Sequence, residues 1–465
     1  MTESNIIPSY TRNDKLIWSL ASLGGQLVAG IYAVLLMYFY QVYIGLDAIY
    51  IAIAAILYAV WNAINDPLFG YISDSKPVGE KGRRIPYMRY SAPFLGLSFI
   101  LVWFVPLDWP ELYIFFWMLG TMLLYDTGYT IAFLMQSALL PEITEDDKER
   151  GEFQKYSSLF FLLGAILGFL IPDFLRPKVG QTSLIPLYIG VTIVGIISVI
   201  FIMIPTYRFK ERPEFTQIDK PLGLIDSIKY TFKSKSFIIL ALANFMSIFM
   251  QAIILGLMFY LADYVMKVPT LYLLIPVFLG LIVGVLIANI FAGKYGVVRA
   301  NQILLLIAGI SLVLLPFIPE DLIYISLFFA GFGISGPLVL TNVLFAQVSD
   351  EDEVKSGVRR EASFFGINAF ITKPAQSLAL AIAPLLLAYA GFIALGGAHI
   401  ESKQPASAIF MIKIIIGLLP GVAMIIGALI LNFYPLKGEY LKEIQVKVLE
   451  MHADKKSKLS EKQIN

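Results

Sequence analysis

The chain has 465 residues, of which 58% are hydrophobic and only 15% are charged. A soluble globular protein carries about 25% charged residues, so this composition excludes a soluble protein of several domains. The chain contains no cysteine and only two histidines, which excludes a disulfide, a thiol nucleophile and a cysteine-ligated metal site. The net charge of +1 gives no sign of a nucleic-acid partner, and we expect neither a nucleic acid nor a cofactor.

The hydrophobic residues are gathered into twelve runs, each close to the roughly 20 residues that cross the hydrocarbon core of a bilayer. Strands of a membrane barrel would alternate polar and apolar residues, whereas these runs are continuously apolar. We therefore predict an all-α membrane protein with twelve transmembrane helices. The predicted spans are residues 17–42, 47–72, 88–106, 112–140, 156–175, 184–206, 237–263, 271–293, 300–317, 321–347, 364–395 and 407–434.

Positive charges are distributed unevenly between the two sets of loops. The loops after odd-numbered spans contain only four of the 35 Lys and Arg residues, namely Arg176, Lys178, Lys267 and Lys403. By the positive-inside rule both ends of the chain are cytoplasmic, which requires an even number of spans. The polar start of the chain and the length of the first run do not fit a cleavable signal peptide. We expect a multi-pass protein of the plasma membrane.

A basic stretch between spans 6 and 7 divides the chain near its middle. Its Lys, Arg and Pro content predicts a cytoplasmic linker (208–236) between an N-terminal six-helix half (1–207) and a C-terminal six-helix half (237–434), followed by a cytoplasmic tail (435–465). The motif EDDKERGEFQKYSS after span 4 resembles EDEVKSGVRREASF after span 10, which suggests parallel repeats. Two such halves place a binding site near the bilayer midplane. Similar charge patterning in cytoplasmic loops is the alternative interpretation.

Asp66 lies deep in span 2, where an acidic residue costs about 2.5–3.5 kcal/mol and usually marks an ion or substrate pathway. Asn62 precedes it by one turn and shares its helix face. Pro67 has no N–H group, so the Ala63 carbonyl loses its usual donor. Carboxylate, amide and carbonyl oxygens suit a cation, and a desolvated carboxylate equally suits a proton. The alternative is a structural Asp that caps a helix or forms a salt bridge.

Other polar residues also lie within predicted spans. Lys373 in span 11 is the natural counter-charge for the carboxylate of span 2, and the alternative is a lysine that extends to the membrane surface. Asp126 and Thr130 share a face of span 4, and we expect Asp126 to line the solute cavity or to carry a second proton. Gln26 in span 1 and Asn368 in span 11 are candidates for the same cavity, although a buried amide can equally join two helices.

The loop after span 2, GYISDSKPVGEKGRR, resembles the cytoplasmic loop signature of the major facilitator superfamily. Gly70, Asp74 and either Arg83 or Arg84 occupy its glycine, aspartate and basic positions. We expect these residues to latch neighbouring helices at a cytoplasmic gate. A basic loop that serves only topology is the alternative.

Three further segments, WNAINDPLFGYISD, YTIAFLMQSALLPEIT and SGVRREASFFGINAFITK, together resemble the glycoside, pentoside and hexuronide cation symporters of the melibiose permease type. The resemblance implies the major facilitator fold and cation-coupled solute uptake. It implies a cation site at Asp66, Asn65 and Thr130, to which we add Asn62. It also implies that Lys373 links this site to the substrate.

The sequence departs from that family in both predicted sites. Asn62 stands where the family has an aspartate, and the loss of one carboxylate favours a proton over sodium as the coupling ion. On the sugar side, four pocket positions of the family fall on Gln26, Phe133, Ser137 and Ser157. The galactoside-binding residues are therefore absent. Asp126 precedes Phe133 by seven residues on the same helix face and is the candidate replacement carboxylate.

We therefore expect a secondary active transporter, and no enzyme, in which a proton or a sodium ion at Asp66 drives symport of a sugar or glycoside-like solute by alternating access. The expected solute-binding residues are Lys373, Gln26, Asp126, Phe133 and Asn368. We expect the protein to contact membrane lipids and to act as a monomer. Two alternatives stay open: cation-coupled transport of an amphiphile such as a lysophospholipid, and a membrane sensor that transports nothing.

Overall fold

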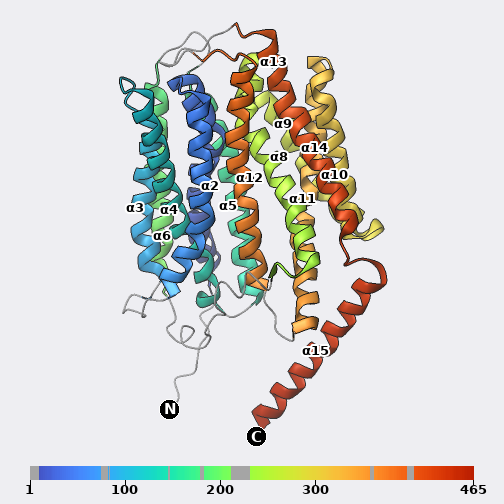
Figure 1. Cartoon of the computed structure of the whole chain (residues 1–465). Helices are drawn as coiled ribbons and strands as arrows, with labels where there is room; N and C mark the ends of the chain where they lie inside the picture. The colour runs from blue at the N-terminus through green and yellow to red at the C-terminus, as the bar shows by residue number, and fades with distance from the viewer. Residues whose placement is uncertain are drawn as a thin grey trace. The chain divides into compact units, whose positions relative to one another are not determined.

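The computed structural model describes residues 10–74, 82, 84–144, 147–177, 183–210, 231–356, 361–394 and 403–464. In these ranges almost all regular structure is helical, as Figure 1 shows. The prediction of an all-α chain is therefore confirmed.

Long helices follow one another along the chain (Figure 1). The first part contains α1 (Arg12–Tyr38), which continues into η1 (Phe39–Ile44), then α2 (Ala48–Asp74), α3 (Arg84–Trp103), α4 (Glu111–Ile143), α5 (Asp147–Leu175) and α6 (Ile185–Arg208). The second part contains α8 (Lys235–Tyr260), which continues into η3 (Leu261–Met266), then α9 (Thr270–Tyr295), α10 (Val297–Leu314), η4 (Leu315–Phe317), α11 (Glu320–Ser356) and α12 (Glu361–Tyr389). The last span is built from α13 (Ala406–Lys413), η5 (Ile414–Leu418), α14 (Leu419–Ile430) and η6 (Leu431–Phe433), and α15 (Gly438–Ile464) follows it.

Eleven helical segments in the described part of the chain are long and apolar enough to cross a membrane. They coincide with eleven of the twelve predicted spans. The remaining predicted span, residues 112–140, corresponds to α4, which has 33 residues and is about 50 Å long at 1.5 Å per residue. Asp126, Thr127 and Thr130 lower its mean hydropathy, and we count it as the twelfth span because of its length.

The eleventh span ends earlier than the prediction of residue 395. The α12 helix ends at Tyr389, and Gly391 follows in the left-handed region with a φ of 79°. The Phe392 N–H group donates to the Leu387 carbonyl at 3.0 Å, and the Gly391 N–H group donates to the Ala388 carbonyl at 2.9 Å. This is the Schellman pattern, in which a glycine past the last turn satisfies the final carbonyls and stops the helix.

The chain forms two compact units. The first contains residues 1–221 together with 255–264 and 380–408, and the second contains 222–254, 265–379 and 409–465. In the first unit α1 packs against α5 and α6, and α3 packs against α4 and α6. In the second unit α11 packs against α9, α10 and α15, and α10 packs against α14. The boundaries of the predicted halves stay a prediction, and most of the predicted linker, residues 211–230, lies outside the described ranges.

Glycines allow the closest helix contacts, because membrane helices associate where small residues let their backbones approach. In the first unit a Cβ atom at Gly168 on α5 would lie 2.9 Å from the Gly30 Cα atom on α1. In the second unit a Cβ atom at Gly280 on α9 would lie 1.9 Å from the Phe328 carbonyl oxygen on α11. Neither crossing therefore has room for a side chain at these positions.

We predict that Gly280→Ala destabilises the protein, because α9 and α11 must move apart to accommodate the methyl group. Overpacking of this kind costs about 1–3 kcal/mol. Gly293→Ala is the matched control on the same helix, since apart from its chain neighbours and the nearby backbone of its own helix, no described atom lies within 4 Å of a Cβ atom placed there. Thermal unfolding in detergent should show a lower midpoint for Gly280→Ala and an unchanged or higher midpoint for Gly293→Ala, because Ala favours the helix. Equal midpoints would contradict the close α9–α11 contact.

Candidate functional site

The predicted cation residues lie where α2 meets α4 in the first unit. Asn65 and Asp66 follow Asn62 by three and four residues, so all three side chains share one face of α2. Thr130 on α4 donates a hydrogen bond from Oγ1 to Asp66 Oδ1 at 2.9 Å. The structure thus brings the four predicted residues to one helix–helix interface.

Asp126 lies at the same interface, one turn before Thr130 on α4. It is 6% exposed and accepts a hydrogen bond from the Tyr58 hydroxyl at 3.1 Å. The Asn65 amide nitrogen donates to its other carboxylate oxygen at 2.7 Å. The structure therefore groups Asp126 with the predicted cation residues of α2, and it places two carboxylates at one interface, of which Asp126 is buried and Asp66 is partly buried.

Two buried amide oxygens at this interface lack a hydrogen-bond donor among the described residues. Asn65 is fully buried and Asn62 is 3% exposed. Because the Asn65 amide nitrogen donates to Asp126, Asn65 Oδ1 must act as an acceptor. Among the described residues, neither Asn65 Oδ1 nor Asn62 Oδ1 has a hydrogen-bond donor. Buried acceptors of this kind are rare, and amide, carboxylate and hydroxyl oxygens are the ligands of hard cations.

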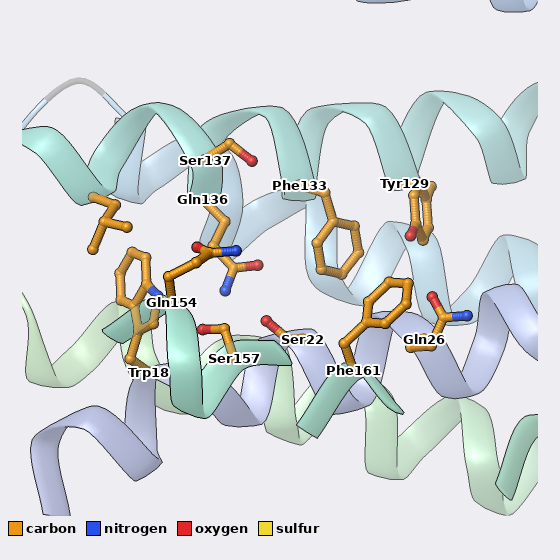
Figure 2. A pocket seen from close by; sticks show the side chains of 11 residues that line it. Trp18, Ser22, Gln26, Tyr129, Phe133, Gln136, Ser137, Gln154, Ser157 and Phe161 are labelled. Carbon is orange, nitrogen blue, oxygen red and sulfur yellow. The ribbon is translucent and has the colours of Figure 1, made fainter. Parts of the chain in front are cut away.

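A pocket of about 250 Å³ lies between α1, α4 and α5 of the first unit (Figure 2). Seven of its lining side chains end in an amide or a hydroxyl group, four are aromatic, with Tyr129 in both sets, and none carries a charge. The lining residues are Trp18, Ser22 and Gln26 of α1, Tyr129, Phe133, Gln136, Ser137 and Leu140 of α4, and Gln154, Ser157 and Phe161 of α5. The spacing of four residues along α1 points Trp18, Ser22 and Gln26 to one side, as Figure 2 shows.

The pocket contains the positions that the family resemblance assigns to a sugar site. All four positions at which the sequence departs from that family's sugar site, Gln26, Phe133, Ser137 and Ser157, line it. The lining contains Gln26 and Phe133 of the predicted solute-binding residues, but it does not contain Asp126. Amide and hydroxyl groups beside aromatic rings can hydrogen-bond and stack against an uncharged, hydroxyl-rich molecule.

One helix carries residues of both the interface and the pocket. Asp126 and Thr130 of α4 belong to the α2–α4 interface, whereas Tyr129 and Phe133 of the same helix line the pocket. The Tyr129 and Phe133 rings lie 4.5 Å apart between their centroids. A movement of α4 therefore displaces residues of the interface and residues of the pocket together.

The other two predicted solute-binding residues lie on α12, in the part of that helix that belongs to the second unit. Asn368 Oδ1 accepts a hydrogen bond from the Asn244 amide on α8 at 3.2 Å. Lys373 is half-buried. Its contact with Asp66 and its role toward the solute stay predictions.

The predicted cytoplasmic gate is described only in part. Gly70 and Asp74 lie in the last two turns of α2, and Arg84 is the first residue of α3. Arg83 lies outside the described residues. The latch between these residues stays a prediction.

Sequence reasoning missed a buried charge cluster at the end of α5. Arg176 donates from Nη2 to Asp173 Oδ1 at 2.9 Å and to Asp263 Oδ1 of η3 at 3.0 Å. The Tyr38 hydroxyl donates to Asp263 Oδ2 at 2.5 Å. Burial alone would lower the pKa of the Arg176 guanidinium, but the charge and hydrogen bonds of Asp263 outweigh burial and hold that pKa above its usual value. The sequence signal was weak: Asp173 lies one helical turn from Arg176, but Asp263 is 87 residues further along the chain.

Comparisons with known proteins agree with this architecture. A family model described as MFS/sugar transport protein matches residues 17–438. Sodium-dependent lysophosphatidylcholine symporter 1 of Gallus gallus is 22% identical over 450 residues, which cover 87% of this chain and 84% of that protein. The putative glycoside/cation symporter YagG of Escherichia coli (strain K12) is 24% identical over 457 residues, which cover 95% of this chain and 96% of that protein.

The fold also matches that of solved transporters. The crystal structure of a D-xylose-proton symporter superimposes with a TM-score of 0.65 at 15% identity, over 92% of this chain and 98% of that one. The major facilitator fold is therefore confirmed, as is the multi-pass membrane location. Since the family model covers most of the chain, this protein belongs to the MFS/sugar transport protein family of the major facilitator superfamily.

Proposed function

We propose that this chain is a cation-coupled symporter that takes up a small, uncharged solute rich in hydroxyl groups, such as a sugar, by alternating access. The family and the similarity to symporters establish a major facilitator transporter. The proposed class of solute rests on one observation. The pocket between α1, α4 and α5 combines amide and hydroxyl groups with aromatic rings and has no charged lining residue.

The chemistry of the pocket favours a sugar-like solute. Gln26, Gln136 and Gln154 reach it from three different helices, and each amide can both donate and accept a hydrogen bond, as hydroxyl groups require. Trp18 and Phe133 add apolar ring faces for the C–H groups of a sugar ring. A volume of about 250 Å³ favours a small solute, because sites for drug-sized ligands begin at roughly 300 Å³.

The driving ion is proposed to bind at Asp66, with Asn62, Asn65 and Thr130 as its neighbours. One positive charge that moves inward across 100 mV gains about 2.3 kcal/mol, which supports roughly fifty-fold accumulation of the solute at 1.4 kcal/mol per tenfold. Either a proton or a sodium ion satisfies this requirement. Lys373 is proposed to compete with the cation for the carboxylate and so to link cation release to solute release.

Coupling is proposed to run through α4, because this helix carries Thr130 of the cation site and Tyr129 of the solute pocket at adjacent positions. A cation that draws α2 and α4 together orients the pocket face of α4 for the solute. The Arg176 cluster is proposed to hold the outer ends of α5 and η3 together in one half of the cycle. It must open in the other half, when the pocket is exposed to the opposite side.

The second candidate solute is an amphiphile such as a lysophospholipid. A specific finding favours it. One relative, which matches this chain over 84% of its own length, is named a sodium-dependent lysophosphatidylcholine symporter. The uncharged pocket lining argues against a zwitterionic head group, because a buried phosphate requires a charged or strongly donating partner. The small volume of the pocket argues against a long acyl chain.

Uptake into proteoliposomes separates these candidates. Purified protein is tested with a panel of radiolabelled pentoses, hexoses and glycosides and with a lysophosphatidylcholine, under an imposed proton or sodium gradient. We expect gradient-driven accumulation of at least one sugar. Accumulation of the lysophospholipid alone would replace the proposed solute by the amphiphile, and no accumulation of any solute under either gradient would favour a membrane sensor.

We predict that Asp66→Asn abolishes gradient-driven accumulation of the transported sugar, because the neutral amide no longer binds and releases a cation. Equilibrium exchange of the same sugar without a gradient should persist, since Asp66 is not among the pocket residues. Thr127→Val is the matched control. Thr127 accepts a hydrogen bond from Trp61 at 3.2 Å within the α2–α4 interface but is not a proposed ligand. Undiminished accumulation by Asp66→Asn would contradict the cation site.

We predict that Gln26→Leu raises the KM for the sugar by about five- to tenfold, because it removes one hydrogen bond worth about 1 kcal/mol. The initial rate of uptake at varied sugar concentration measures this change. Gln302→Leu on α10 is the control, since Gln302 bonds to the Ala428 carbonyl and to Asn432 and does not line the pocket. Equal KM values for the two variants would exclude the pocket as the solute site.

A further inference from the structure

We infer that Asp126 is the second carboxylate of the cation site and that this site takes sodium, with oxygen ligands from both α2 and α4. The inference rests on the proposed function, because it completes the ligands and names the ion of the same site. The sequence predicts that Asp126 lines the solute cavity or carries a second proton, and in the structure Asp126 accepts a hydrogen bond from Asn65.

Two hydrogen bonds connect α2 and α4 at adjacent residues of α2. Asn65 donates to Asp126 at 2.7 Å, and the next residue of α2, Asp66, accepts from Thr130 at 2.9 Å. Asp126 precedes Thr130 by one helical turn, so each helix brings one carboxylate to the same region of the interface. Tyr58 fixes Asp126 from the preceding turns of α2 at 3.1 Å. The two carboxylates therefore approach one site from opposite helices.

The amide oxygens of Asn65 and Asn62 are buried acceptors at the same interface. Asn65 cannot turn its amide around, because its oxygen would then face the Asp126 carboxylate at hydrogen-bond distance. Asn65 Oδ1 therefore stays an acceptor, and Asn62 Oδ1 lies on the same helix face one turn earlier. Within the described residues both atoms are buried and lack a donor. A ligand of this interface must therefore be coordinated by the lone pairs of several oxygen atoms.

Sodium satisfies this requirement and a proton does not. A proton on one carboxylate gives a donor to one acceptor, whereas a sodium ion contacts several oxygens at once. Two carboxylates, two amide oxygens and the Thr130 hydroxyl form an all-oxygen set, which a hard cation prefers. A divalent metal is disfavoured, because no group of three or more His, Cys, Asp or Glu side chains that could hold one occurs among the described residues. Asp126 thus supplies from α4 the negative charge that α2 lacks at Asn62.

The test measures binding of radiolabelled sodium to the purified full-length protein in detergent, in choline chloride and without solute. We expect saturable binding to the unaltered protein. Asp126→Asn should weaken it by about tenfold or more, since even residues that only position metal ligands contribute ten- to hundredfold. The double variant Asn62→Asp with Asp126→Asn should regain most of the affinity, because a carboxylate returns one turn from Asp66. Thr127→Val, at the same interface, should bind as the unaltered protein does.

Two results would overturn the inference. Unchanged sodium affinity in Asp126→Asn alongside lost affinity in Asp66→Asn removes Asp126 from the site and leaves the proposed function intact. Absence of saturable sodium binding by the unaltered protein excludes sodium as the ion of this site. In that case a separate measurement of proton-driven sugar uptake decides whether the proposed function holds. If Asp126→Asn does not purify as a monodisperse protein, Asp126→Ser takes its place, and the double variant must still bind more tightly than the single one.

Discussion

A carboxylate in the hydrocarbon core of a membrane is unstable unless its surroundings compensate its charge. Asp66 and Asp126 meet this constraint at the α2–α4 interface, where Thr130, Tyr58 and Asn65 donate hydrogen bonds to them. The positions of these donors fix how α2 and α4 pack. The cation that we propose for this site adds the opposite charge at the same place, so the proposal makes cation binding and the packing of these two helices depend on each other.

The α4 helix carries residues of both the α2–α4 interface and the pocket. Its polar residues lower its mean hydropathy, and it is not among the eleven described helices that are long and apolar enough to cross a membrane. This helix carries Asp126 and Thr130 at its interface with α2, and Tyr129 and Phe133 at the pocket. Polar side chains reduce the apolar surface of a membrane helix, and neighbouring helices compensate by satisfying these polar groups.

Much of this arrangement could be predicted from the sequence. The apolar runs gave the spans, because a helix that faces lipid must stay apolar along its whole length. The end of α12 was missed because the apolar composition continues past the Gly391 turn that stops the helix. The contact between Asp126 and Asn65 was missed for another reason. Helical spacing put it on a face with Phe133, but spacing on one helix does not reveal which neighbour covers each turn of that face.

Partners that are distant in the sequence were the least predictable. Arg176 appeared only as one positive charge in an outer loop, and its ion pair with Asp263 depends on a contact between α5 and η3 that no local pattern encodes. The four positions of the sugar pocket were identified through the family resemblance. All four residues line the pocket between α1, α4 and α5 and none of them is charged, whereas their role in binding a sugar stays a prediction.

The central claim is that one helix links cation binding to solute binding, and thermodynamic linkage tests it most directly. Calorimetry measures the Kd of the transported sugar with and without saturating sodium, and the Kd of sodium with and without saturating sugar. The account predicts that each ligand tightens the other by the same factor, which is typically five- to 150-fold for coupled sites. Sugar and sodium affinities that are indifferent to each other would contradict it.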